Sequence, residues 1–86
     1  MTKHERFLQR LMSGHSDTDI SFDALCSLLK RLGFQVRVRG DHHIFTKDGI
    51  AEIINLQPRG AKAKPYQIKQ VRNILRAYQL NNEEKE

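Results

Sequence analysis

Two adjacent histidines, His42 and His43, directly follow the sequence Gly40-Asp41 and are the residues best suited to chemistry in this 86-residue chain. Histidine has an unperturbed pKa of about 6.5, so it can take up and return a proton near neutral pH. On RNA it can remove the proton of a 2′-hydroxyl, so that this oxygen attacks the adjacent phosphorus, or it can protonate the departing 5′ oxygen. DNA lacks this internal nucleophile, so a histidine site without a metal favours RNA.

Only one of the two histidines is expected to act on a given atom. Adjacent residues of a strand point to opposite faces of the sheet, so one ring should face the core and the other should face outward. The outward ring would lie beside Arg37 and Arg39, whose charges can stabilise a phosphoryl group. A surface or purely structural histidine is the alternative from the residues alone.

The positive charge of the chain is concentrated in its middle. Fifteen Lys and Arg against ten Asp and Glu give a net charge of +5, and residues 30–80 alone sum to +8. This distribution indicates a polyanionic partner, although a solvated basic face, or one that meets an acidic protein, would have the same composition. The candidate RNA-binding residues are Arg37, Arg39, Lys62, Lys64, Lys69, Arg72 and Arg76.

Neither a metal nor a cofactor is expected. Cys26 is the only cysteine, which excludes a cysteine-rich zinc site and fits a reducing cytoplasm, and we expect it to be buried. No phosphate-cradling glycine loop is present. The longest apolar run is three residues, at 24–26, so a membrane span or a signal peptide is not expected.

Helical periodicity is clearest before these histidines. A first helix is predicted from Thr2 to Met12, followed by a polar connector at 15–20. A second begins after Ser21, whose hydroxyl can cap it, and ends at Gly33. In such a glycine stop, Phe34 would fold back onto Leu29.

The apolar period then changes from 3.6 to 2. Strands are predicted at 34–39, 42–46 and 50–56, joined by turns at Gly40-Asp41 and Asp48-Gly49, and residues 57–64 are expected to form a loop. Pro65 suits the first position of a last helix with one apolar and one cationic face. The predicted fold is therefore α+β, a three-stranded antiparallel sheet whose helices cover one face.

Residues 22–80 resemble the HicA family of toxins from prokaryotic toxin–antitoxin systems. The resemblance is carried by three stretches: Leu28-Leu29-Lys30-Arg31-Leu32-Gly33-Phe34, then Gly40-Asp41-His42-His43-Ile44-Phe45, and a last helix with Ile68, Val71, Ile74 and Leu75. The helix that ends in Gly-Phe and the His-His strand are together more specific than either alone.

The resemblance implies a fold similar to double-stranded-RNA-binding domains, α-β-β-β-α, here with an extra N-terminal helix. It also implies cleavage of mRNA independently of the ribosome until a cognate HicB antitoxin covers the site. The catalytic histidine of the family maps onto His42. The residue before it is usually serine or another small residue, and the carboxylate of Asp41 would repel a phosphate.

We therefore expect a single domain at 1–80, divided into an N-terminal extension at 1–20 and a HicA-like core at 21–80, with a disordered tail at 81–86. The expected activity is that of a cytoplasmic, metal-independent endoribonuclease toxin with His42 as its catalytic residue. The rival prediction is a non-catalytic module for double-stranded RNA, and a domain that binds only an acidic protein is a third.

Overall fold

A computed structural model describes residues 2–80, so the expected disordered tail lies outside the described residues. Three helices and five strands follow one another along the chain. They are α1 (Lys3–Ser13), α2 (Phe22–Arg31), β1 (Gln35–Arg39), β2 (His42–Thr46), β3 (Ile54–Leu56), β4 (Pro58–Arg59), β5 (Lys62–Ala63) and α3 (Pro65–Ala77).

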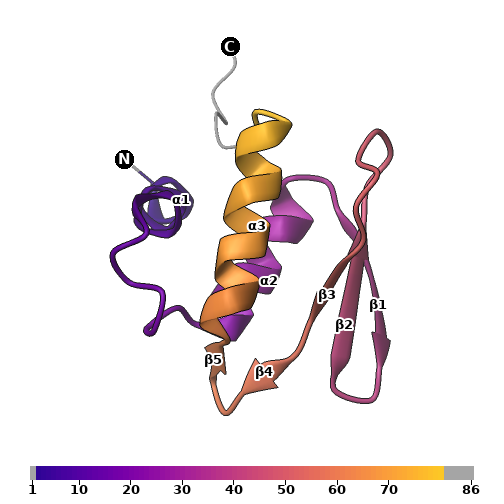
Figure 1. The fold of residues 1–86 in the computed structure, drawn as a ribbon, viewed down its shortest axis with the longest axis horizontal. Coiled ribbons are helices and arrows are strands. Elements are labelled where there is room, and N and C mark those ends of the chain that lie inside the picture. Colours follow the sequence, from indigo (N-terminus) through magenta and orange to yellow (C-terminus); the bar gives the residue numbers. More distant parts are fainter. Residues whose placement is uncertain (1, 81–86) are drawn as a thin grey trace.

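The predicted α+β fold is confirmed. Strands β1, β2 and β3 form an antiparallel sheet in that order, in which Arg39 pairs with His42 and Phe45 pairs with Ile54. Helices α2 and α3 lie on one side of this sheet, and α1 lies beside them, away from the strands (Figure 1). Because no helix within residues 2–80 covers the other face of the sheet, outward side chains of the strands can reach solvent.

Local signals define α2. The Ser21 hydroxyl accepts a hydrogen bond from the Ala24 amide at 3.2 Å, and Gly33 takes a left-handed φ of 101° after the helix. The Phe34 amide then donates to the Leu29 carbonyl at 3.0 Å, and both side chains are buried. These contacts confirm the predicted glycine stop, which turns the chain from α2 into the sheet.

The N-terminal extension adds a packed helix. The Thr2 hydroxyl accepts from the Glu5 amide at 3.1 Å, while the Glu5 carboxylate accepts from the Thr2 amide at 2.8 Å. This reciprocal capping box starts α1. Leu8 and Leu11 are buried, and α1 contacts both α2 and α3, so the extension shares the core of the other helices.

Two predictions about the middle of the chain are wrong. The third strand covers only Ile54–Leu56, because the Ala51 amide donates to the Tyr78 hydroxyl at 3.3 Å instead of joining the sheet. The expected loop at 57–64 contains the small hairpin of β4 and β5. The backbone of this hairpin is hydrogen-bonded to the segment just before α2, where the Ala63 amide donates to the Ile20 carbonyl at 2.9 Å.

The core lies between the sheet and the two covering helices. Phe45, Ile54 and Leu56 point inward from the strands, and Leu25 and Ile68 meet them from α2 and α3; all five are fully buried. Burial of side chains of this size contributes about 1.5–3 kcal/mol each. Within residues 2–80, no helix has the length and apolar character needed to cross a bilayer.

Candidate functional site

The two histidines face opposite sides of the sheet, as the strand alternation predicts. His43 shares the inward face of β2 with Phe45, and its ring meets Phe22 edge-on, with centroids 4.9 Å apart. His42 lies on the outer face, where its side chain is 48% exposed. Of the two rings, His42 is therefore the more accessible to a large substrate.

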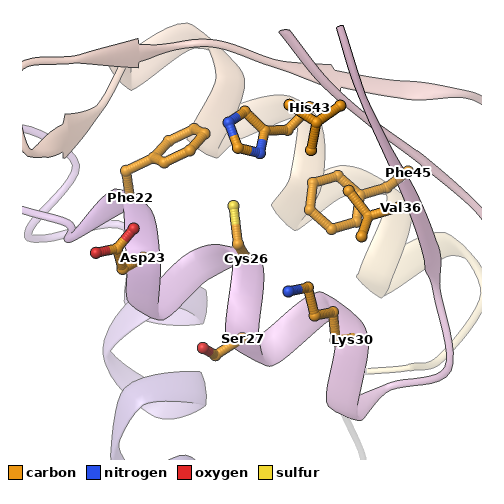
Figure 2. Close-up of a pocket in the computed structure, with 9 residues that line it drawn as sticks. Phe22, Asp23, Cys26, Ser27, Lys30, Val36, His43 and Phe45 are labelled. Carbon is orange, nitrogen blue, oxygen red and sulfur yellow. The ribbon is translucent and has the colours of Figure 1, made fainter. Parts of the chain in front are cut away.

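The inward histidine lies between α2 and the sheet. It lines a cleft of about 260 Å³ between α2 and the strands, together with Phe22, Cys26 and Val36 (Figure 2). Cys26 is buried as expected, and burial raises the pKa of its thiol to about 11. The thiol is thus protonated and unreactive at neutral pH. Asp23, Ser27 and Lys30 of α2 also line the cleft.

The outward histidine is held by a neighbouring strand. Its ring nitrogen Nδ1 lies 3.1 Å from Oδ1 of Asn55, the middle residue of β3. The other nitrogen, Nε2, lies 3.8 Å from Oδ1 of Asp41, in the turn before β2. One side of the ring is thus bonded to a neutral amide, and the other is close to a carboxylate without a direct hydrogen bond.

The carboxylate of Asp41 is itself restrained by a short chain of side chains. Gln57 donates from its amide nitrogen to Asp41 at 2.8 Å, and Lys64 donates to the amide oxygen of Gln57 at 3.2 Å. The hydrogen bond from Gln57 holds the pKa of Asp41 below its ordinary value. Asp41 is consequently a charged carboxylate at neutral pH and cannot serve as the proton donor.

Arginines flank the histidine on the open face of the sheet. Arg39 pairs with His42 across β1 and β2, and Arg37 lies two residues away on the same face. Both are exposed, and both line a surface groove of about 530 Å³ together with Ile44. Strand pairing thus places His42 beside Arg39 on the face that carries this groove, although His42 is not among the residues that line it.

The cations of α3 are distributed along its length. Lys64 is at the N-terminal end, where free backbone amides favour anions, and this end lies with the β1–β2 turn at the lower side of the molecule (Figure 1). Lys69 is exposed in the middle of the helix. Arg76 lies in the last turn, at the opposite end from the β1–β2 turn. Lys64 is therefore the α3 cation nearest to His42.

Two of the predicted RNA-binding residues, Lys62 and Arg72, form ion pairs with aspartates of the same chain. Arg72 pairs with Asp17 and donates its Nε to the Leu11 carbonyl at 3.0 Å, and its side chain is only 11% exposed. Lys62 pairs with Asp19, which also meets Arg10 at 3.0 Å. The hydrogen bond from Lys62 holds the pKa of Asp19 below its ordinary value. The connector of the N-terminal extension thus neutralises part of the basic surface.

Sequence reasoning missed the side chains that organise the site. They are Asn55 in the middle of β3, Gln57 directly after that strand and Gln67 in α3. Gln67 is 3% exposed, a polar residue within the apolar stripe of its helix. That anomaly was visible in the sequence, since a buried amide needs hydrogen-bond partners.

No group of three or more His, Cys, Asp or Glu that could hold a metal ion occurs among the described residues. The polar groups near His42 are instead an amide, a carboxylate and basic side chains. This set suits proton transfer and binding of an anion.

Comparison with known proteins gives one match. The family model described as the HicA toxin of bacterial toxin–antitoxin systems matches residues 22–80, from the first residue of α2 to the last described residue. No curated protein and no solved structure matches significantly. The matched range includes His42 and its partners Asp41 and Asn55, while α1 and the connector with Asp17 and Asp19 precede it.

Proposed function

Because the chain belongs to the HicA family of toxins, we propose that it is an endoribonuclease that cleaves mRNA without a metal, with His42 as its catalytic residue. Family membership makes it the toxin of a toxin–antitoxin pair and implies a cognate HicB antitoxin. Since the proposed substrate is mRNA, the protein would act in the cytoplasm.

One observation carries the proposal: His42 is the histidine that faces outward, on the same open surface as Arg37 and Arg39. A general base must reach the proton that it removes, and the half-buried ring of His43, which packs against Phe22, is less suited to this than the exposed ring of His42. Cations beside the base can stabilise the charge that develops on the phosphoryl oxygens.

The reaction uses the substrate's own nucleophile. His42 takes the proton of a ribose 2′-hydroxyl, the 2′ oxygen forms a bond to the adjacent phosphorus, and the bond from phosphorus to the 5′ oxygen breaks. The departing oxygen takes a proton from water, since Asp41 is ionised at neutral pH. The products are a 2′,3′-cyclic phosphate and a 5′-hydroxyl, and the imidazolium returns its proton to solvent.

Five basic residues are proposed to bind the RNA backbone: Arg37, Arg39, Lys64, Lys69 and Arg76. Arg39 and Lys64 are closest to His42, while the others extend the basic surface along the sheet and α3. Lys62 would have to release Asp19 before it could bind a phosphate. Arg72 is left out, because its guanidinium is bonded to Asp17 and Leu11.

The test uses an RNA oligonucleotide, excess chelator and a matched substrate in which the nucleotide at the cleaved position is 2′-deoxy. We expect cleavage of the all-RNA strand to a cyclic phosphate and a 5′-hydroxyl, and no cleavage at the deoxy position. Cleavage of both substrates, or products with a 3′-hydroxyl and a 5′-phosphate, would show a different nucleophile.

The rival function is binding of double-stranded RNA without cleavage. It is favoured by the α-β-β-β-α core and by Lys64 at the start of α3, a position that suits a phosphate. The same assay separates the two functions, because a binding module would retain RNA and leave it intact at every pH.

A further inference from the structure

We propose that Asn55 is a positioning residue that keeps the His42 ring protonated at Nδ1, so that Nε2 is the nitrogen that exchanges a proton with RNA. The tautomer is a property of the free protein, whereas its use in cleavage rests on the function proposed above. The two parts can therefore be tested separately.

The first step is the hydrogen bond between the side chains. Oδ1 of Asn55 lies 3.1 Å from Nδ1 of His42. An amide oxygen can only accept a hydrogen bond, so the proton of this bond must be on Nδ1. In a neutral imidazole the partner of one nitrogen determines the state of the other. Nε2 is then left with its lone pair and can act as the base.

The second step is the surroundings of Nε2. Its distance of 3.8 Å from the Asp41 carboxylate is too long for a hydrogen bond, so the lone pair remains available. The bond from Gln57 holds this carboxylate from the side of its other oxygen, Oδ2. Asp41 can therefore attract the imidazolium that forms after proton uptake, without blocking the nitrogen in the neutral state.

The third step explains why Asn55 is in the correct position. The buried side chain of Gln67 donates to the Asn55 carbonyl at 3.3 Å and accepts from the Gln57 amide at 3.3 Å. Between those two residues, Leu56 is fully buried. Gln67 of α3 is thus hydrogen-bonded to the backbone on both sides of Leu56, and these bonds hold the segment that presents Asn55 to the histidine.

The ring nitrogens of His42 can be observed directly by ¹⁵N NMR of the full chain without RNA, at a pH where the ring is neutral. We expect the Nδ1–H tautomer in the wild type. Asn55→Ala should shift the ring toward the Nε2–H form, and Asn55→Asp should keep Nδ1–H, because a carboxylate oxygen also accepts. Asn73→Ala, an exposed asparagine on α3, is the matched control and should leave the spectrum of His42 unchanged.

Kinetics provide the second measurement. We expect Asn55→Ala to lower kcat about 10- to 100-fold with little change in KM, the range found for side chains that orient a metal-bound imidazole, and Asn55→Asp to recover most of the loss. Thermal unfolding of each variant identifies any loss of fold.

A wild-type ring protonated at Nε2, or a tautomer unchanged in Asn55→Ala, would overturn the role of Asn55. A wild type that cleaves no RNA but has the Nδ1–H tautomer would overturn the proposed function and leave the positioning of the ring established.

Discussion

Asp17 and Asp41 each meet a cationic or titratable side chain, and the two pairs differ in exposure. Asp17 and Arg72 join the N-terminal connector to α3, with side chains 15% and 11% exposed. Asp41 and His42 lie at the β1–β2 turn, with side chains 62% and 48% exposed. The side chains of the second pair are thus about four times as exposed as those of the first. The first pair is enclosed by the protein, whereas the second is open to a substrate.

Burial determines what each pair can do. Removing one member of an enclosed pair leaves its partner with an uncompensated charge in a poorly hydrated site, so such a pair is needed for stability. An exposed pair contributes little to stability, because water solvates both members. Charge in the second region is therefore available for binding and proton transfer, whereas charge in the first is used to dock α1 and its connector.

The largest effect on this comparison is expected from Asp17→Asn. The change removes the charge that faces Arg72 while keeping the size of the side chain. We expect a loss of about 1.5–3 kcal/mol in the free energy of unfolding, as for hydrogen bonds to charged groups, measured by chemical denaturation. The cleavage rate of the folded protein should be unchanged, because Asp17 makes its described contact with Arg72 rather than with the His42 site.

Asp19→Asn is the control for that substitution. It removes the same charge from the same connector, but from a carboxylate that is 62% exposed. We expect a smaller loss of stability than in Asp17→Asn. An equal loss in both variants would contradict the difference between enclosed and exposed pairs.

An intermediate effect is expected from Lys64→Gln, which removes the α3 cation nearest to the site. RNA affinity should fall. The negative slope of log K against log salt should become shallower by about 0.7, the value for one lost phosphate contact with a single strand. Lys3→Gln in α1 makes the same chemical change far from the site and should leave the slope unchanged. Identical slopes for both variants would exclude Lys64 from the RNA-binding surface.

The smallest effect is expected from Asp41→Asn. Its depressed pKa keeps this carboxylate charged at neutral pH, and the charge is lost only as the pH falls through a value below the ordinary one. Removing this charge should tighten RNA binding, by up to about fivefold for a well-hydrated charge near a phosphate. Binding curves at low salt for the variant and the wild type measure the difference, and weaker binding by the variant would contradict the expected repulsion.

Elements defined by nearby residues could be predicted from the sequence. The cap, the glycine stop and the Phe34 contact of α2 are all local, and the alternation of β1 and β2 placed His42 and His43 on opposite faces. The shortened β3 could not be predicted, because the Tyr78 hydroxyl that binds Ala51 comes 27 residues later.

The same distinction holds for the candidate site. Arg39 and His42 adjoin a two-residue turn, so their pairing followed from the sequence. Asn55 could not be placed beside His42, since the register of β3 depends on packing against α3. Arg72 fits the cationic face of its helix by periodicity, and only the fold brings Asp17, 55 residues earlier, into contact with it.

The most direct test of RNA cleavage by the exposed histidine is the rate of cleavage by His42→Ala, measured beside the wild type and His15→Ala, an exposed histidine in the connector. We expect all three proteins to have similar thermal stability. His15→Ala should cleave at the wild-type rate, and His42→Ala should be slower by about 10²- to 10⁴-fold, the usual contribution of a positioned acid or base. A His42→Ala variant that folds and cleaves RNA as fast as the wild type would show that His42 is not catalytic.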